Sequence, residues 1–547
     1  MRHAKILDCT LRDGAYLVDK DFGNMTIQGI ISGLIKAKVD FIEIGFFQDD
    51  GFGEGKTVFL NSKDARRFIP SDKSGCQFTV LADFSRYSIN NLDERTEGGI
   101  DGVRECFFKH ERFEAIKYCK VIKEKGYEVF IQPVDILGYT DNELIEFIEL
   151  INELEPYCFS IVDTFGSMYQ EDLHRIFELI NHNLIQSCKI GFHSHNNMQL
   201  SNALSQECIR MTSGKREVII DGTLSGMGRG AGNTPTELIA QYMVSRLGYS
   251  YDIDAILDVI DSCMDNVRSR CTWGYSTPYF IAGSYGAHVN NITYLANKNS
   301  IRSKDIRYIL NKIGVAERKR YDYDLLENTY LDLLRFDIDD TESLHKLKNI
   351  IGAKSVLIVA PGNTAVTCID NIQKYIQEEK PVVITVNFIH EGIKTDYVYM
   401  NNVKRFDYWK NNKNFMSMNK ILTSNVNKEI NDANNILTIS FMKLVKCGWE
   451  HFDNSTIMLL RLLDICSVKK IAIAGFDGYE YADSEKHNYV NKFLESSMQV
   501  FNFSEVNSEI SKMLVDYINT RTNKDVAITF ITPSRFERCL KAEKMSE

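Results

Sequence analysis

Prolines, tryptophans and long apolar runs are scarce in this sequence. Its 547 residues include 8 prolines and 3 tryptophans, and no low-complexity tract interrupts them. No run approaches the roughly 20 apolar residues that cross a membrane, and residues 1–9, MRHAKILDC, lack a signal peptide's apolar core. The sequence therefore predicts folded globular domains in the cytoplasm and excludes a membrane-spanning or disordered chain.

An excess of positive charge is also missing. Lysines and arginines number 64 against 74 acidic residues, which gives a net charge of −10 and a pI near 5.7. Such a chain has no basic field to attract a nucleic-acid backbone or an anionic membrane surface. We therefore expect small-molecule partners and no nucleic acid, and leave homo-oligomerisation open.

Paired cysteines are absent as well. The 13 cysteines are scattered among apolar runs, and no C-x-x-C pair occurs. Spacing of this kind is typical of buried, reduced thiols and not of a disulfide framework or a zinc site.

The length and the alternation of the chain predict its architecture. A chain of 547 residues exceeds what one hydrophobic core usually supports, so at least two domains are expected. From residue 1 to about 248, short apolar runs alternate with longer amphipathic ones, which is typical of βα units around a parallel sheet. Eight such units predict an α/β fold with an N-terminal TIM (β/α)8 barrel. The expected strands are Ala4–Cys9, Phe41–Phe46, Gln77–Ala82, Gly102–Phe107, Glu128–Pro133, Cys158–Asp163, Lys189–His193 and Glu217–Asp221.

Polar side chains follow most of these expected strands. In a (β/α)8 barrel the carboxyl ends of all strands meet on one rim, where active sites lie. Convergence from so many strand ends favours catalysis over stability as their role. The residues are Asp8, Arg12, Asp13, Glu43, Gln48, Asp83, Gln132, Asp135, Asp163, Thr164, His193, His195, Asp221 and Thr223.

Three of these strand ends carry motifs. The stretch KILDCTLRDGAY, residues 5–16, places a cation, Arg12, beside a carboxylate, Asp13, and KIGFHSH, residues 189–195, puts His193 and His195 on the same strand face. One carboxylate and two imidazoles on strand ends can hold a divalent ion with positions left for substrate. A surface turn with a local ion pair and structural histidines is the alternative for each motif taken alone. The third motif is DGTLSGMGRGAGN, residues 221–233, a strand end followed by a glycine-rich loop.

Together, LRDGAY, HSHNNMQLSNA and GMGRGAGNTPTE resemble the signatures of the DRE-TIM metallolyases, and most closely their 4-hydroxy-2-oxovalerate aldolase branch. The resemblance covers roughly residues 1–335. It implies Mn²⁺ or Mg²⁺ on Asp13, His193 and His195, with Asn233 near the metal. The implied reaction is reversible cleavage of a 4-hydroxy-2-oxo acid into pyruvate and an aldehyde. Arg12 would then stabilise the enolate oxygen as a preorganised cation.

Further residues are expected at this site. Asp163 and Thr164 at the sixth strand end, with Gly228 and Gly230 in the glycine loop, are candidates for substrate binding. By the match of CTWGYSTPYFIAGSYGAHVNNI to the start of the aldolase branch's helical extension, Tyr275 would point back at the active site. Packing of this aromatic in a helical cap is the alternative.

Tyr16 departs from the family pattern. The aldolase branch keeps its catalytic histidine two residues after the RDG glycine, where this chain has Tyr16. A phenol is a poor base at neutral pH unless a metal or arginine lowers its pKa. Tyr16 could therefore act as a catalytic tyrosinate, act through a water, or merely shape the pocket.

After the barrel the pattern changes twice. Residues 249–345 are expected to be a helical extension, with helices at Ile253–Arg268, Pro278–Asn297, Ser303–Ile313 and Tyr323–Leu334. Residues 346–547 open with a βαβ pattern and predict a Rossmann-like α/β domain of unknown ligand. They faintly resemble sialyltransferase-like Rossmann domains, which would fit a role in glycan or sugar-acid biosynthesis. The expected strands are Ser355–Ala360, Val382–Asn387, Tyr397–Met400, Ile436–Ile439, Lys470–Ala474 and Val526–Ile531.

Three functions agree with these features. The first is a metal-dependent aldolase or lyase that makes or breaks a bond between pyruvate and an aldehyde. The second is a Claisen-type acyl transferase on the same barrel. The third is a non-catalytic barrel with a metabolite-binding or assembly role, because the motif histidine is missing.

Overall fold

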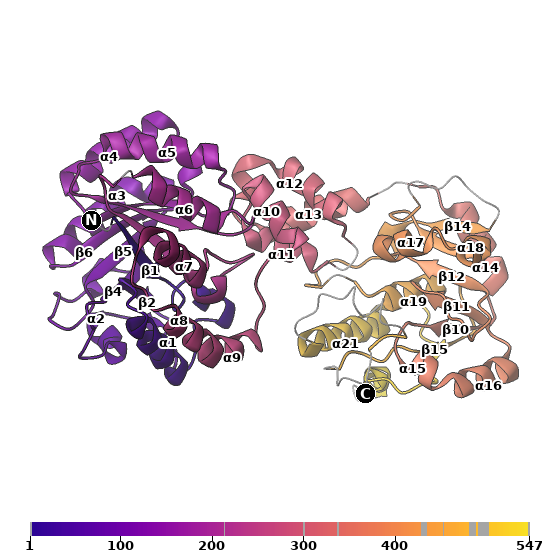
Figure 1. Ribbon diagram of the computed structural model, residues 1–547. Helices are drawn as coiled ribbons and strands as arrows, with labels where there is room; N and C mark the ends of the chain where they lie inside the picture. Colours follow the sequence, from indigo (N-terminus) through magenta and orange to yellow (C-terminus); the bar gives the residue numbers. More distant parts are fainter. Residues whose placement is uncertain are drawn as a thin grey trace. The chain divides into compact units, whose positions relative to one another are not determined.

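The computed structural model describes residues 3–212, 214–298, 301–335, 338–427, 435–451, 453–480, 488–490 and 503–544. The chain divides into two compact units. The first contains residues 1–292 with 318–320, and the second contains residues 293–317 with 321–547. Each unit is built around its own parallel sheet (Figure 1).

The first unit is the predicted barrel. Eight parallel strands close on themselves because β1 pairs with both β2 and β9, and a short additional strand, β3 (Val58–Phe59), extends from β2. This closure confirms the (β/α)8 fold. The barrel strands are β1 (Ala4–Asp8), β2 (Phe41–Phe47), β4 (Gln77–Asp83), β5 (Gly102–Phe107), β6 (Glu128–Pro133), β7 (Cys158–Asp163), β8 (Lys189–Ser194) and β9 (Val218–Gly222).

Helices surround these strands (Figure 1). Each buries one apolar face in the barrel's core, as Leu144, Phe147, Ile148 and Ile151 of α4 do. A capping box explains where α4 begins, because Thr140 accepts a hydrogen bond from the Glu143 N–H and Glu143 accepts one from Thr140. The helices are α1 (Asn24–Lys36), α2 (Ser62–Ala65), α3 (Arg112–Glu124), α4 (Asp141–Leu154), α5 (Gln170–Asn183), α6 (Ser201–Met211) and α7 (Thr236–Leu247).

The helical segment that follows includes α8 (Ile253–Val259), a π-helical turn (Ile260–Met264) and α9 (Asp265–Arg268). The single helix predicted over Pro278–Asn297 is wrong. The chain forms α10 (Thr277–Tyr285) and α11 (Val289–Ala296), because Gly286 ends α10 in the left-handed conformation with φ +56°. Three more helices belong wholly or mainly to the second unit: α12 (Ser303–Arg318), α13 (Tyr323–Leu334) and α14 (Thr341–Ile351).

The second unit contains a parallel sheet with the strand order β14-β13-β12-β11-β10-β15-β16. The order reverses between β10 and β15, which makes it a doubly wound α/β sheet and confirms a second α/β domain. Sequence reasoning missed β13, a strand of four residues. The strands are β10 (Ser355–Val359), β11 (Val382–Val386), β12 (Tyr397–Met400), β13 (Lys420–Thr423), β14 (Ile436–Ile439), β15 (Lys470–Ala474) and β16 (Ala527–Phe530). Its helices are α15 (Thr364–Thr367), α16 (Ile369–Glu379), α17 (Val403–Trp409), α18 (Lys413–Ser417), α19 (Ser455–Ile465) and α21 (Phe503–Thr520).

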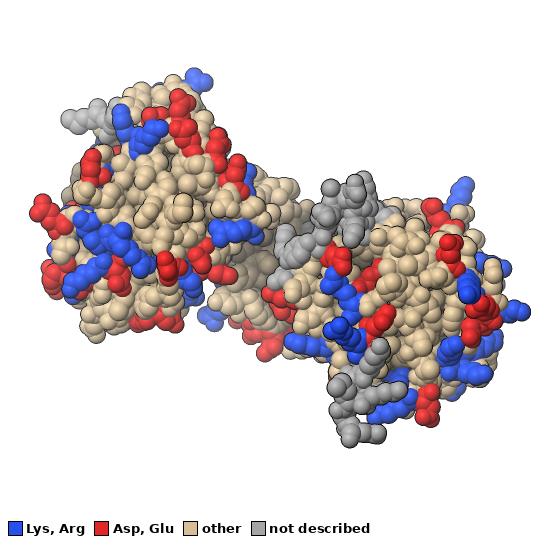
Figure 2. Space-filling view, turned by 90° about the horizontal axis from the view of Figure 1, so that it is seen from below, with Lys and Arg blue, Asp and Glu red and all other residues tan. Residues whose placement is uncertain are grey.

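The cysteines, the surface charges and the apolarity of the helices bear on the remaining predictions. The cysteines are free thiols, as predicted, but only seven of the 13 are buried, and Cys447 is exposed. On the face drawn in Figure 2, acidic and basic side chains are interspersed among the described residues. Among the described residues, no helix is both long and apolar enough to cross a membrane.

Candidate functional site

The three residues predicted to bind a metal lie together at the carboxyl rim of the barrel. Asp13 follows β1, while His193 and His195 lie at the end of β8 and just after it. The Nε2 atoms of His193 and His195 are 3.5 and 3.3 Å from Oδ2 of Asp13. All three possible ligand atoms lie within 4.8 Å of one another, so these residues form a possible metal-binding group.

Hydrogen bonds fix which nitrogen of each imidazole faces Asp13. Nδ1 of His195 is 3.0 Å from the backbone oxygen of Asp163, which can only accept, so Nδ1–H donates there. Nδ1 of His193 is 2.9 Å from Oδ2 of Asp221 and donates to that carboxylate. In their neutral forms both rings therefore present the Nε2 lone pair toward Asp13.

Three acceptors consequently converge without a proton between them. Oδ2 of Asp13 is buried and has no hydrogen-bond partner among the described residues. Lone pairs that face one another in a buried site repel unless a cation lies among them. The donor set, one carboxylate and two imidazoles, therefore fits a divalent ion.

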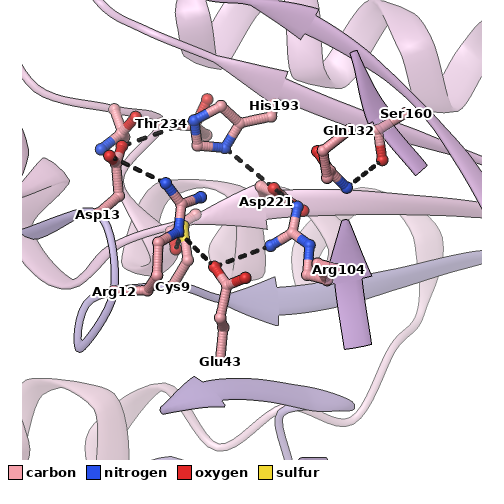
Figure 3. Close-up of polar contacts among 12 residues, drawn as sticks. Cys9, Arg12, Asp13, Glu43, Arg104, Gln132, Ser160, His193, Asp221 and Thr234 are labelled. Carbon is pink, nitrogen blue, oxygen red and sulfur yellow. Dashed lines mark hydrogen bonds and ion pairs between the residues drawn. The ribbon is translucent and has the colours of Figure 1, made fainter. Parts of the chain in front are cut away.

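Arg12 lies directly beside this group (Figure 3). Its Nη1 donates to Oδ1 of Asp13 at 3.1 Å, and its Nε donates to Oε2 of Glu43 at 2.7 Å. Arg12 is 7% exposed, and these two carboxylates hold its guanidinium in one orientation. The pKa of Asp13 lies well below its usual range, because Arg12 and the two imidazoles outweigh burial.

Arg104 of β5 joins the two sides of the site, and sequence reasoning did not identify it. Its Nη1 donates to Glu43 at 3.0 Å, and its Nη2 donates to Asp221, the same carboxylate that accepts from His193 (Figure 3). Arg104 is fully buried. One signal in the sequence could have identified it, because an arginine in the middle of a buried strand, GVRECF, needs acidic partners inside the barrel.

The net charge of this cluster suits a cation. Asp13, Glu43 and Asp221 carry three negative charges, and Arg12 and Arg104 carry two positive ones, which leaves one negative charge. The pKa of His193 is raised, because the carboxylates of Asp13 and Asp221 beside its two ring nitrogens outweigh the effect of burial. A proton therefore competes with a metal ion for Nε2 of His193.

The glycine loop brings Asn233 to the site. The isolated bridge between His195 and Asn233 places the two residues side by side. Nδ2 of Asn233 donates to the Met227 oxygen at 3.0 Å, while its Oδ1 is buried without a partner among the described residues. An unsatisfied amide oxygen next to His195 fits the implied role of Asn233 beside a metal.

The two glycines predicted to bind substrate make room for asparagines, and their contact with substrate stays a prediction. A Cβ at Gly228 would lie 2.2 Å from Nδ2 of Asn233. Gly230 has φ +67°, and its Cβ would lie 2.6 Å from Oδ1 of Asn197. Asn197 in turn accepts from the Ala231 N–H at 2.9 Å, so these contacts fasten the loop and position Asn233.

Asp163 and Thr164 are engaged in holding loops. Oδ1 of Asp163 accepts from the backbone N–H groups of Ser167 at 2.9 Å and Met168 at 3.3 Å. Burial raises the pKa of Asp163 to about 6. Oγ1 of Thr164 accepts from the Asp135 N–H at 2.8 Å. Substrate contact by either residue stays a prediction.

Tyr16 lies beside the site with its ring beneath Arg229 of the glycine loop. The guanidinium carbon of Arg229 is 3.9 Å from the ring centroid, and Phe46 packs edge-on at 5.2 Å. The pKa of Tyr16 is raised, because burial outweighs Arg229 and Arg12. Arg12 and Arg229 therefore do not by themselves provide the lowered pKa that a catalytic tyrosinate requires.

The segment after the barrel contributes two further groups. Tyr275 is 63% exposed, unlike the buried site residues, and its approach to the site stays a prediction. His288 was not identified from the sequence. Burial, Arg229 and His195 lower the pKa of His288 to about 4, and its Nδ1 accepts from the Asn290 N–H at 3.1 Å. It is a neutral imidazole at neutral pH.

Comparison with known proteins shows what the barrel resembles. Residues 3–262 match the HMGL-like family model, in agreement with the DRE-TIM resemblance. The 4-hydroxy-2-oxovalerate aldolase of Thermomicrobium roseum is 27% identical over 349 residues, which are 60% of this chain and 92% of that protein. The oxaloacetate decarboxylase of Mycobacterium tuberculosis is 26% identical over 294 residues, which are 52% of this chain and 83% of that protein.

Proposed function

We propose that this chain, with its HMGL-like barrel, is a divalent-metal-dependent lyase that breaks or makes the carbon–carbon bond between C3 and C4 of a 2-oxo acid, the carbons α and β to its keto group. The observation that carries the proposal is the convergence of three acceptors, on Asp13, His193 and His195, directly beside the guanidinium of Arg12. The names of the relatives, an aldolase and a decarboxylase, support the same type of reaction.

Mn²⁺ or Mg²⁺ held by Asp13, His193 and His195 would supply Lewis-acid polarisation of the keto oxygen. Arg12 adds a fixed positive charge beside that oxygen as enolate charge develops. Its hydrogen bonds to Glu43 and Asp13 are already made, so no reorganisation is needed during the reaction. Asp221 accepts a hydrogen bond from Nδ1 of His193 and is itself held by Arg104, so these two residues orient the His193 ring.

The first candidate reaction is a retro-aldol cleavage of a 4-hydroxy-2-oxo acid. A water takes the proton of the 4-hydroxyl group, the C3–C4 bond breaks, and its electron pair forms the enolate of pyruvate while an aldehyde leaves. A proton from water then adds to C3 and gives pyruvate. Arg12 stabilises this enolate oxygen. Assays with several 4-hydroxy-2-oxo acids, including ones that release a sugar-derived aldehyde, decide which aldehyde this chain uses.

One observation favours a second candidate, decarboxylation of a 2-oxo diacid such as oxaloacetate. Tyr16 occupies the motif position of the aldolase histidine, and its pKa is raised. Decarboxylation needs no base at this position, because the electron pair that forms the enolate comes from the bond to the departing carbon dioxide. Both reactions form the same enolate and use Arg12 in the same way.

Product analysis distinguishes the two candidates. The metal-stripped protein is reconstituted with Mn²⁺ and supplied with 4-hydroxy-2-oxovalerate or oxaloacetate. Pyruvate is measured in both reactions, aldehyde in the first and carbon dioxide in the second. The Asp13→Asn variant with Mn²⁺ corrects for metal-catalysed decarboxylation in solution. Pyruvate release from neither substrate above that background would argue against the proposal.

A further inference from the structure

Strand order marks a crevice in the second unit. From β10 the chain proceeds outward through β11, β12, β13 and β14, and then returns to place β15 on the other side of β10 (Figure 1). Because parallel crossovers are right-handed, the connections after β10 and β15 leave the sheet toward opposite faces. Open α/β sheets bind ligands in the crevice that forms at this point, beyond the carboxyl ends of the strands.

A cavity of about 190 Å³ lies at this edge of the sheet. Its lining residues lie between 360 and 536, so the second unit alone forms it. Gly362 follows β10, Asn387 follows β11, Asn402 follows β12 and Gly475 follows β15. The cavity therefore lies where the strand order predicts a ligand site.

Two glycines let the loops of β10 and β15 approach each other closely. Gly475 has φ +69°, and a Cβ there would lie 2.2 Å from the Ala360 oxygen. A Cβ at Gly362 would lie 2.4 Å from the Gly475 oxygen. Because neither position has room for a side chain, backbone forms this side of the cavity.

The acidic residues of the cavity are bonded to protein donors. Asp477 accepts from the Thr364 N–H at 2.7 Å, so its carboxylate occupies the place beside the β10 loop where nucleotide-binding folds hold a phosphate. Asp453 accepts from Arg461 and from the Lys446 N–H, and Glu509 is 2.9 Å from Nδ1 of His451. A ligand anion is thus excluded from the β10 loop and must lie elsewhere.

Cationic side chains lie on the other wall. Lys404 and Arg405 are adjacent on α17, and His451 precedes α19. Lys404 is exposed, and within the described part of the chain it has no ion-pair partner. Although Lys404 is exposed as a whole residue, desolvation of its ammonium group and the positive charge of Arg405 lower the pKa of Lys404, whereas the hydrogen bond to Glu509 raises the pKa of His451. An anion beside Lys404 and Arg405 would relieve the repulsion between their two positive charges.

The third wall is apolar. Val506, Ile510 and Met513 of α21 line the cavity together with Phe536. A bare inorganic ion would leave this wall without a contact, whereas a phosphate ester could use both walls. We propose that this cavity binds a phosphorylated small molecule, with its phosphate beside Lys404, Arg405 and His451 and its organic part against α21.

Isothermal titration calorimetry on the full chain tests this site. The probes are AMP, ribose 5-phosphate, inorganic phosphate and adenosine. We expect at least one phosphate ester to bind with a Kd below about 1 mM, and its counterpart without phosphate to bind at least about tenfold more weakly. Comparing AMP with ribose 5-phosphate separates a nucleotide from a sugar phosphate.

Single substitutions test whether the phosphate ester binds in this cavity. Lys404→Met should weaken binding of the ester at least about tenfold, whereas Lys413→Met, an exposed lysine of α18, should bind like the parent. Asp13→Asn in the barrel should also leave this binding unchanged, which separates it from the lyase proposal. The proposal is overturned if no ester binds, if Lys404→Met binds as tightly as the parent, or if inorganic phosphate binds as tightly as the esters.

Discussion

Both units place polar side chains at the carboxyl ends of parallel strands. The charge that these side chains offer to a ligand is negative in the first unit and positive in the second. At the barrel rim, acceptors of Asp13, His193 and His195 converge, and the surrounding ion-pair cluster keeps one net negative charge. In the second unit the acids are bonded to protein donors, while Lys404 has no ion-pair partner among the described residues. The same backbone geometry therefore suits a metal cation in one unit and an anion in the other.

This difference shows that the fold provides the position of a site and the side chains decide its ligand. The barrel residues come from strand ends and are nearly fully buried, so their geometry is fixed before substrate binds. Variants of single residues should therefore affect one unit and leave the other unchanged.

His195→Ala should abolish both metal binding and lyase activity. The substitution removes one of the three converging ligand atoms, and two ligands do not hold the ion through dialysis. Metal analysis after dialysis is the measurement, and His110→Ala, an exposed histidine of the same barrel, is the control. Stoichiometric Mn²⁺ in dialysed His195→Ala would exclude this metal site.

Arg12→Lys should lower kcat by about 10²-fold or more while leaving metal content unchanged. A single ammonium group cannot contact Glu43 and Asp13 and also face the enolate, as the guanidinium can. Steady-state kinetics with metal analysis separates the two effects. Near-parental kcat would remove Arg12 from the reaction.

Asp221→Asn should weaken Mn²⁺ binding by about 10- to 100-fold. The amide accepts less strongly from Nδ1–H of His193, so that ring is less basic and less firmly oriented, and Arg104 loses an ion pair. Mn²⁺ titration measures the change, with the surface variant Asp141→Asn as control. An unchanged Kd would show that the orienting bond to His193 is dispensable.

Mn²⁺ affinity should fall as the pH is lowered. Because the pKa of His193 is raised, a proton competes with the metal from a pH above the usual imidazole value of about 6.5. Below the pKa of His193, the Kd should rise about tenfold per pH unit for one competing proton. Titrations at several pH values test this, and an affinity independent of pH between 5 and 8 would contradict it.

Tyr16→Phe should reduce kcat by less than about tenfold. Because burial outweighs Arg229 and Arg12 in setting the pKa of Tyr16, we expect a neutral phenol, so that losing its hydroxyl removes a hydrogen-bonding group and not a base. A pH–rate profile should show no basic-side ionisation that the variant lacks. Complete loss of turnover, with metal content intact, would restore Tyr16 as the catalytic base.

Much of the barrel could be predicted from the sequence, since each of its strands is a buried apolar run that ends in polar residues. The bounds of β5, β6 and β7 agree with the predicted ones. The H-x-H spacing placed His193 and His195 on one face because a strand alternates its side chains. In contrast, β13 (KILT) has only two aliphatic residues, between a lysine and a threonine, whereas the equally short β12 (YVYM) and β14 (ILTI) are richer in apolar residues.

What could not be predicted depends on contacts between distant positions. Arg104 bonds to residues 61 and 117 positions away, and nothing in GVRECF indicates either partner. The pKa of Tyr16 is set by burial and by Arg229 on another strand's loop. The cavity of the second unit likewise combines several strand ends with α17 and α21, so it becomes visible only after folding.

Release of pyruvate by the full chain tests the central claim most directly. Metal-stripped protein is assayed with 4-hydroxy-2-oxovalerate and with oxaloacetate, before and after adding Mn²⁺, against Asp13→Asn treated in the same way. The account predicts release from at least one substrate that requires Mn²⁺ and is lost in Asp13→Asn. Equal release by the parent and Asp13→Asn, on both substrates, would contradict it.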